Sequence, residues 1–314
     1  MPFEHLPLND GSTIPSIAYG SSSIPLDQTP TQIGVAIEVG FEHIDTAQCT
    51  PSIPLSSTSP CFKSYRNEAE VGQGIKESGL ARKDIYVTTK WSRVDEKMPR
   101  QSCEESLDML GLEYVDLYLI HAPRHCRGDI PGTWKQMEEL YKLGYAKRIG
   151  VSNFSVDDLR EVLDCCSIKP VVNQILLHPE VYHETAPLLA YMAKHNIVPE
   201  GYSPLRPLRS DSPGPVVKVV EHIAAKHGAN SEQVLLAWIK TKGAVAITKS
   251  SMKKRLEGMI SAGDLALSHH DIAAIERAGH KHAKLELVKT RALSASRWVA
   301  LVCLMGYAGW RLLA

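Results

Sequence analysis

A regular alternation of short apolar runs and helical patterns dominates this sequence. Several of the runs are almost continuously apolar, as expected for parallel strands that are buried on both faces. Eight such units in one chain favour a closed (β/α)8 barrel, the TIM-barrel fold of the α/β class, over an open doubly wound sheet. The expected strands are Ser16–Gly20, His43–Ala47, Ile85–Lys90, Val115–His121, Ala146–Val151, Val171–Ile175, Ile197–Tyr202 and Val245–Thr248.

Helical patterns follow the second to the seventh of these strands. Ser155 is a suitable N-cap for one helix, and Gly144 and Gly228 are placed to end two others. The polar turn Asn-Asp-Gly-Ser at residues 9–12 precedes the first strand and predicts an N-terminal β-hairpin across one end of the barrel. The expected helices are residues 67–78, 99–110, 132–143, 155–165, 184–195 and 215–227, with a further helix at 231–242.

Composition narrows the functional classes. The chain has 314 residues, a length that suits a single barrel, and 44% of them are hydrophobic, which is enough for a large core. Lys plus Arg and Asp plus Glu both number 35, so bulk charge gives no reason to expect a nucleic-acid partner. The seven cysteines form no CxxC pair and no Cys/His metal spacing, which predicts free thiols in a reducing cytoplasm and no metal site. The first residues lack the pattern of a secretory signal, so we expect none.

Polar residues stand at the end of nearly every expected strand. In a barrel of this kind the active site lies at these carboxyl ends. Each residue alone has a structural explanation, such as an ion pair between Asp45 and Lys90 or a core position for His121. Together they predict one shared site. The residues are Asp45, Lys90, His121, Ser152, Asn153, Asn173, Gln174, Tyr202, Ser203, Lys249 and Ser250.

The residue types in this set point to carbonyl chemistry. A tyrosine beside the lysine of an Asp–Lys pair would have its phenolate favoured, with a pKa drawn down from about 10. Such a tyrosine acts as a general acid toward a carbonyl oxygen, and a nearby histidine donates a second hydrogen bond to it. No tyrosine directly follows the strand that ends near Asp45. Two residues compete for that place, Thr50 and Tyr65.

A set of motifs in fixed order carries a family resemblance. Over roughly residues 5–280, apart from an insert, the chain resembles the aldo-keto reductases. Any one motif alone has little specificity, but the ordered set is specific. The motifs are "GSTIPSIAYGS" at 11–21, "GFEHIDTA" at 40–47, "YRNEAEVGQGIKES" at 65–78, "VTTK" at 87–90, "VDLYLIHAP" at 115–123, "GYAKRIGVSNFS" at 144–155, "VVNQILLHP" at 171–179, "GYSPL" at 201–205 and "AITKSS" at 246–251.

The resemblance implies a catalytic tetrad and a cofactor site. The tetrad would be Tyr65, Asp45, Lys90 and His121, with the substrate against His121 and Ala122. NADPH would lie extended across the rim without a Rossmann domain, consistent with the absence of a GxGxxG turn. Its implied ligands are Ser152, Asn153 and Gln174 for the carboxamide, Tyr202 for the nicotinamide face, Ser203 and Leu205 for the pyrophosphate, and Lys249, Ser250 and Arg255 for the 2′-phosphate.

Two departures from the family pattern affect the expected binding sites. Gly258 and Met259 occupy positions where the family often has Glu and Asn in contact with adenine, so those contacts are not expected here. Ala122 in "HAP" replaces the frequent tryptophan, which predicts a roomier substrate pocket.

Residues 49–64 interrupt the catalytic motif. The family spacing implies a tyrosine five residues after the aspartate, whereas Tyr65 follows Asp45 by 20 positions. The insert is either a real surface loop, which adds only about 1 kcal/mol of loop-closure entropy, or translated non-coding sequence such as an unspliced intron. Sequencing the transcript across codons 46–66 distinguishes the two. If Thr50 took the place of Tyr65, the general acid would be lost.

The C-terminal tail is also atypical. We expect one barrel domain over residues 1–282 and an apolar tail over 283–314. Residues 298–310 carry no charge, but this stretch is shorter than the roughly 20 apolar residues of a spanning helix. A helix packed on the barrel or a loose terminus is therefore favoured over a membrane anchor.

The sequence thus predicts a cytoplasmic NADPH-dependent reductase of aldehydes or ketones, a monomer or weak dimer that acts on a small carbonyl compound. The segment "LIHAPRHCRGDIPGTWKQMEEL" at residues 119–140 most resembles fungal reductases of conjugated polyketones and α-keto amides, which suggests dicarbonyl or α-keto substrates. The alternative is a non-catalytic barrel that binds NADPH as a redox-sensing or scaffold subunit. Tyr65→Phe discriminates them, because only the reductase needs the phenol.

Overall fold

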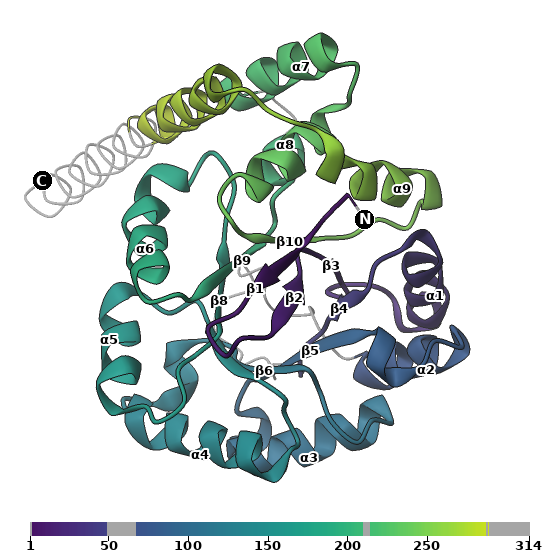
Figure 1. Ribbon diagram of the computed structural model, residues 1–314, viewed down its shortest axis with the longest axis vertical. Coiled ribbons are helices and arrows are strands. Elements are labelled where there is room, and N and C mark those ends of the chain that lie inside the picture. Colours follow the sequence, from purple (N-terminus) through teal and green to yellow (C-terminus); the bar gives the residue numbers. More distant parts are fainter. Residues whose placement is uncertain (1, 49–66, 210–213, 287, 289–314) are drawn as a thin grey trace, which may run out of the picture.

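Eight parallel strands close into a barrel in the order β10-β3-β4-β5-β6-β7-β8-β9 (Figure 1). The computed structural model describes residues 2–48, 67–209, 214–286 and 288. All eight predicted strands are confirmed, with ends within three residues of those expected. The strands are β3 (Ile17–Gly20), β4 (His43–Asp45), β5 (Tyr86–Trp91), β6 (Leu117–Ile120), β7 (Ile149–Ser152), β8 (Val172–Leu176), β9 (Val198–Tyr202) and β10 (Val245–Thr248).

Helices surround the barrel on all sides (Figure 1). The seven predicted helices are confirmed as α2 to α8. Two more, α1 and α9, were not predicted, and a further helix at residues 269–286 packs beside α6 and α7. The bounds are α1 (Thr29–Val39), α2 (Glu68–Glu77), α3 (Pro99–Leu110), α4 (Ile130–Leu143), α5 (Val156–Cys165), α6 (Tyr182–Lys194), α7 (Pro215–His227), α8 (Ser231–Lys240) and α9 (Lys253–Ser261).

Local sequence signals set the ends of several helices. Ser155 caps α5 in a capping box with Asp158, in which each side chain accepts from the other's backbone N–H. Gly144 and Gly228 end α4 and α7 in the left-handed conformation, with φ of 81° and 62°. These three predicted caps are confirmed.

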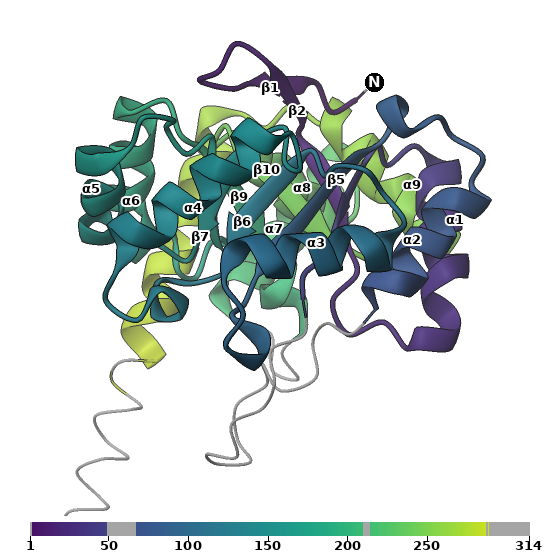
Figure 2. The ribbon, with the colours of Figure 1, turned by 90° about the horizontal axis from the view of Figure 1, so that it is seen from below.

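The predicted hairpin closes one end of the barrel (Figure 2). Strands β1 (His5–Pro7) and β2 (Thr13–Pro15) pair antiparallel around a turn in which Gly11 has a φ of 82°. The hairpin is tied to the segment that precedes β8, since Asn9 Nδ2 donates to the Pro170 oxygen at 2.9 Å. Its Leu8 and Ile14 side chains are buried in the same apolar cluster as barrel residues. Because apolar side chains fill this end of the barrel, the opposite end is the one available to polar groups.

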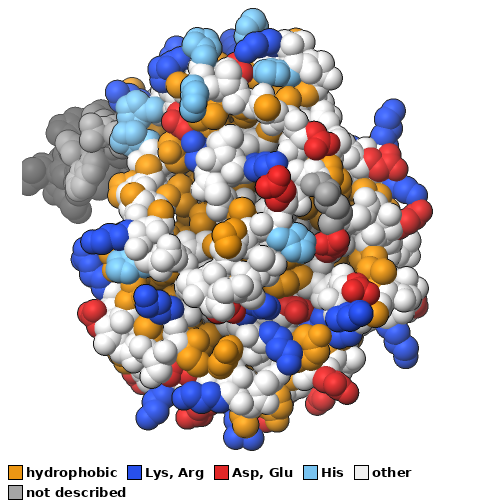
Figure 3. Space-filling view, viewed as in Figure 1, with side chains coloured by type: hydrophobic (Ala, Val, Ile, Leu, Met, Phe, Trp, Pro, Cys, Tyr) orange, Lys and Arg blue, Asp and Glu red, His pale blue; other side chains and the backbone are white. Residues whose placement is uncertain are grey.

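The barrel wall and the helices share a large apolar core. Their contact buries residues such as Trp91, Trp134 and Trp238, each at most 1% exposed. Burying a large apolar side chain contributes roughly 1.5–3 kcal/mol, so this layer stabilises the scaffold on which the polar groups stand. The outer surface of the hairpin face mixes both signs of charge (Figure 3).

No helix within the described part of the chain is long and apolar enough to cross a membrane. The expected insert at 49–64 and the uncharged stretch at 298–310 lie outside the described residues.

Candidate active site

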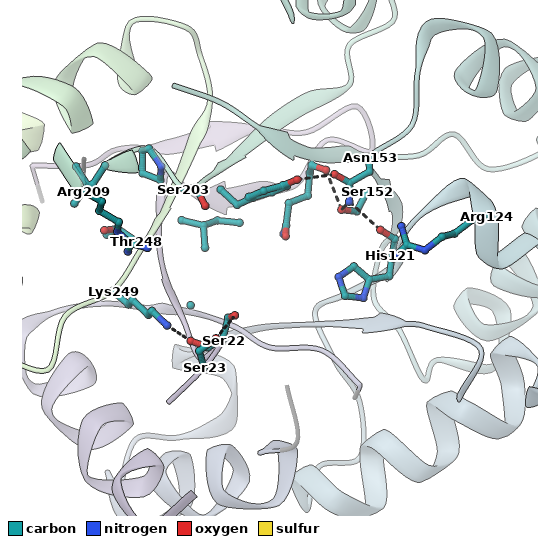
Figure 4. A pocket seen from close by; sticks show the side chains of 16 residues that line it. Ser22, Ser23, His121, Arg124, Ser152, Asn153, Ser203, Arg209, Thr248 and Lys249 are labelled. Carbon is teal, nitrogen blue, oxygen red and sulfur yellow. Dashed lines mark hydrogen bonds between the residues drawn. The ribbon is translucent and has the colours of Figure 1, made fainter. Parts of the chain in front are cut away.

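A cavity of about 370 Å³ opens at the carboxyl ends of the strands (Figure 4). Eight residues predicted for the site line it: His121, Ser152, Asn153, Gln174, Tyr202, Ser203, Leu205 and Lys249. The other lining residues are Gly20, Ser22, Ser23, Arg124, Pro204, Arg209, Ile247 and Thr248. The strand ends therefore do converge, as barrel geometry requires.

A buried ion pair joins strands β4 and β5 inside the barrel near this cavity. Lys90 Nζ donates to Asp45 Oδ1 at 2.7 Å and to Oδ2 at 2.8 Å, and also to the Thr46 backbone oxygen at 2.8 Å. Both side chains are at most 1% exposed. Because the ammonium is fully buried and multiply bonded, its position is fixed, as a group that tunes a neighbouring acid must be.

Gln174 connects this pair to the cavity. Its Nε2 donates to Asp45 Oδ2 at 2.9 Å and to Glu200 Oε2 at 2.8 Å. The flipped amide would place oxygen against the Asp45 carboxylate, so the nitrogen must face inward. The amide oxygen is then the end of Gln174 left to face the cavity that the residue lines.

Glu200 is a buried acid that sequence reasoning missed. It lies on β9 in register with Gln174 on β8 and is fully buried. Burial, and then the nearby Asp45 carboxylate, raise the pKa of Glu200 to about 8, so the side chain is mostly neutral at pH 7. The signal in the sequence was a single acidic residue inside an otherwise apolar strand.

His121 stands at the end of β6 as a neutral imidazole. Burial, followed by the charge of Lys90, holds the pKa of His121 well below its usual range. Its Nδ1 lies 2.6 Å from the Ser92 hydroxyl. If that hydroxyl donates to Nδ1, the neutral ring carries its proton on Nε2 and can donate there. Ser92 was not predicted.

Three residues at the carboxyl ends of β7 and β9 form a connected polar edge. Tyr202 OH donates to Asn153 Oδ1 at 2.9 Å, and Asn153 Nδ2 donates to the His121 oxygen at 3.0 Å and to Ser152 Oγ at 2.9 Å. Asn153 has a left-handed backbone with a φ of 60°, and Ser203 has one of 57°. Non-glycine residues in this region cost free energy and concentrate at functional sites.

The far end of the cavity is basic. Lys249 donates to the backbone oxygen of Ser22, and Arg209 lines the same end (Figure 4). Burial, and then the charge of Arg209, lower the pKa of Lys249. Leu205 and Ser203 also line the cavity.

Some predicted site residues are not among those that line the cavity. Asp45 and Lys90 are buried and reach it through Gln174. Ala122 is 2% exposed and does not line this cavity. Ser250 accepts from the Met252 N–H at 3.1 Å beside the start of α9, and Arg255 pairs with Glu232. Tyr65 and Thr50 lie outside the described residues.

The two α9 residues that depart from the family pattern have different surroundings. Met259 is fully buried, with its sulfur 3.6 Å from Thr248 Oγ1, so it packs against the barrel. A Cβ at Gly258 would meet only Asn230 Nδ2, at 3.7 Å. Neither provides a polar group at the rim.

No metal site accompanies these groups within the described ranges, where no cluster of three or more His, Cys, Asp and Glu side chains is placed to hold an ion.

Known proteins match this chain over most of its length. It is 33% identical to an NAD/NADP-dependent indole-3-acetaldehyde reductase of Schizosaccharomyces pombe, across 89% of this chain and 96% of that protein. It is 36% identical to the morphine 6-dehydrogenase of Pseudomonas putida, across 86% and 89%. A Bombyx mori aldo-keto reductase solved with NADP superimposes with a TM-score of 0.76 at 31% identity, across 88% and 94%.

The model of the Aldo/keto reductase family matches residues 17–280, which include the whole barrel and every described residue that lines the cavity. The predicted resemblance is confirmed, and this chain belongs to the aldo/keto reductase family.

Proposed function

We propose that this protein is an NADPH-dependent oxidoreductase that reduces aldehydes or ketones, including α-keto and dicarbonyl compounds, to alcohols. The observation that carries the proposal is the buried Lys90–Asp45 pair, linked through Gln174 to a cavity that also holds His121. A fixed ammonium inside the barrel and a neutral imidazole at the rim are the groups that a proton-assisted carbonyl reduction requires.

The residues present fit an extended anionic dinucleotide. No described residue that lines the cavity is acidic, and Lys249 and Arg209 stand together at one end. Cations paired with phosphate give strong, charge-assisted hydrogen bonds. The relative named as NAD/NADP-dependent and the neighbour solved with NADP support the same cofactor. When bound, NADPH supplies the hydride to the carbonyl carbon.

The chain's own residues would bind and orient that cofactor. Ser152, Asn153 and the outward amide oxygen of Gln174 offer hydrogen-bond partners for a carboxamide, beside the Tyr202 ring as a stacking surface. Ser203 and Leu205 would line the pyrophosphate. Lys249, Ser250 and Arg255 would bind the 2′-phosphate, with Arg255 leaving Glu232 to do so. These three residues would favour NADPH over NADH.

We assign the proton to Tyr65. Tyr65 would donate its phenol proton to the carbonyl oxygen as the carbonyl is reduced, and the product would be an alcohol. Lys90, held by Asp45, would stabilise the phenolate that remains. His121 would donate from Nε2 to the same oxygen and orient it. Thr50 in that place would leave the enzyme inert, because an aliphatic hydroxyl is far less acidic than a phenol.

The proposal includes a domain division and a setting. Residues 1–282 would form one catalytic barrel that carries the insert at 49–64, and residues 283–314 would be an appended tail. The enzyme would act in the cytoplasm as a monomer or weak dimer, on small carbonyl compounds and without a nucleic-acid partner.

Two readouts on the wild-type protein test this function. NADPH binding is followed by quenching of tryptophan fluorescence, and NADPH oxidation is followed with phenylglyoxal as the dicarbonyl probe. We expect tight binding and oxidation that depends on the carbonyl compound. Tight binding without oxidation of NADPH by any aldehyde or ketone would instead identify a binding protein.

A further inference from the structure

The charged side chains that line the cavity are all cationic. They are Arg124, Arg209 and Lys249, and no Asp or Glu stands among the described lining residues. Arg209 and Lys249 lie at one end, while Arg124 lies beside His121 at the other (Figure 4). The anionic cofactor proposed above accounts for the two cations Arg209 and Lys249. It does not account for Arg124.

Arg124 is held at this end by a short helical turn, η5 (Pro123–Cys126), that follows β6 directly. The turn is closed by the His125 N–H, which donates to the Ala122 oxygen at 3.1 Å. Arg124 lies close enough to the imidazole to act on it electrostatically. The pKa of His121 is lowered mainly by burial, then by Lys90 and His125, and also by the charge of Arg124. Arg124 is exposed and also lines the cavity, so its side chain is accessible to solvent and to a ligand bound there.

The neighbouring arginines have acidic partners, and Arg124 has none among the described residues. Glu96 serves both neighbours, with an ion pair to Arg127 and a contact of 4.0 Å to Arg93. No described carboxylate lies within ion-pair distance of Arg124. In the rest of the sequence, residues 49–66 and 287–314 contain no Asp or Glu at all, and residues 210–213 contain only Asp211. The chain thus offers little to neutralise this guanidinium.

We propose that Arg124 binds a carboxylate on the substrate, so that the preferred substrates are carbonyl compounds that carry a negative charge close to the reacting carbonyl, as α-keto acids do. This inference rests on the proposed function and names the substrate class of the same site. The carbonyl oxygen would face His121, and the carboxylate would extend toward the planar guanidinium, which can bind it through two parallel hydrogen bonds.

The test compares an acid with its neutral ester. Phenylglyoxylate and methyl phenylglyoxylate share the same ketone and ring, so the ratio of their kcat/KM values isolates the contribution of the charge. Arg124→Met removes the charge and keeps most of the side-chain length. Arg124→Lys keeps the charge but lacks the planar guanidinium that can make two parallel hydrogen bonds. Arg127→Met is the matched control, since Arg127 is an exposed arginine nearby that does not line the cavity.

We expect the acid-to-ester ratio to fall about tenfold in Arg124→Met, which corresponds to about 1.4 kcal/mol, mainly through KM for the acid. Arg124→Lys should fall between this value and wild type, and Arg127→Met should keep the wild-type ratio. In wild type, KM for the acid should also rise with salt, because the charge pair is exposed to solvent. An unchanged ratio in Arg124→Met, or an equal fall in Arg127→Met, overturns the proposal.

A binding measurement separates this inference from the reductase function. Phenylacetate has the carboxylate but no reducible carbonyl, so its binding needs no turnover. In the presence of NADP⁺ it should raise the midpoint of thermal unfolding of wild type, and it should raise that of Arg124→Met much less. Equal shifts in the two proteins contradict the role of Arg124. If phenylacetate bound but neither ketone were reduced, the result would support the carboxylate site at Arg124 and contradict the proposed reductase function.

Discussion

Lys90 Nζ lies 2.7 and 2.8 Å from the two carboxylate oxygens of Asp45, and the pair is sealed from solvent inside the barrel. Taking two charges out of water is costly, and apolar side chains of similar volume often stabilise a core equally well or better. The pair is therefore poorly explained as a stabilising device. In the proposed mechanism, the pair presents a fixed positive charge to the reacting groups.

Removing only one partner of this pair should destabilise the protein strongly. Asp45→Leu or Lys90→Met alone leaves an uncompensated buried charge, and we expect each to lower the free energy of unfolding by about 3–5 kcal/mol. The double variant should be more stable than either single one. Urea unfolding of the four proteins measures this. A double variant whose loss equals the sum of the two single losses would contradict the account. As a surface control, Arg160→Ala, which breaks the pair with Asp157, should cost at most about 1 kcal/mol.

Glu200 should make stability fall as the pH rises. Its pKa is about 8 in the fold against 4.5 in an open chain, so only the unfolded chain releases the proton between those values. The folded state therefore loses stability progressively from about pH 4.5 to 8, on the order of a few kcal/mol, and no further above pH 8. Glu200→Gln mimics the neutral acid and removes this effect.

The measurement is the difference in free energy of unfolding between Glu200→Gln and wild type across this pH range. Other buried groups that do not contact Glu200, such as His125 with its pKa lowered by burial to about 4, titrate in both proteins and largely cancel. We expect the free energy of unfolding of Glu200→Gln to rise relative to that of wild type up to about pH 8. A difference that is flat with pH would show that Glu200 is ionised in the fold.

Lys249 should affect the choice of cofactor. If it binds the 2′-phosphate, Lys249→Met should weaken NADPH about tenfold or more, the loss of a charge-assisted hydrogen bond, and should change NADH binding far less. Dissociation constants for both cofactors, measured by fluorescence, test this. Lys253 is the control, because it pairs with Glu38 on the surface and does not line the cavity. Equal weakening of NADH and NADPH by Lys249→Met would remove Lys249 from the phosphate site.

Two helical glycines should respond in opposite ways to alanine. A Cβ at Gly72 in α2 would stand 2.2 Å from the Leu110 backbone oxygen at the end of α3, so Gly72→Ala should cost about 1–3 kcal/mol. A Cβ at Gly258 in α9 has room, so Gly258→Ala should stabilise the protein by about 0.5–1 kcal/mol. Thermal unfolding of both variants measures the two signs. Similar shifts for both would mean that α2 and α3 do not pack as closely as described.

Periodicity predicted the barrel because buried parallel strands and amphipathic helices leave clear patterns. The missed helix α1 (Thr29–Val39) contains several β-branched residues, which resemble a strand in isolation. The start of α9 is the basic run Lys253-Lys254-Arg255, which reads as a polar turn.

The site was predictable in its strand-end residues and not in their partners. Gln174 and Asp45 follow from their places in the motifs, but the third member, Glu200, depends on the register of β8 against β9, which no single strand encodes. Ser92 and Arg124 lie just beyond strands, in connections whose course depends on tertiary contacts. The place of Tyr65 relative to Lys90 is likewise a question that strand patterns do not decide.

The most direct measurement of the central claim is the rate of NADPH oxidation with phenylglyoxal by wild type and by Tyr65→Phe, together with the NADPH dissociation constant of each. Loss of a general acid typically costs about 10²–10⁴-fold. The account predicts that Tyr65→Phe lowers kcat by about that factor while the two proteins bind NADPH equally well. An undiminished rate of NADPH oxidation in Tyr65→Phe would contradict it.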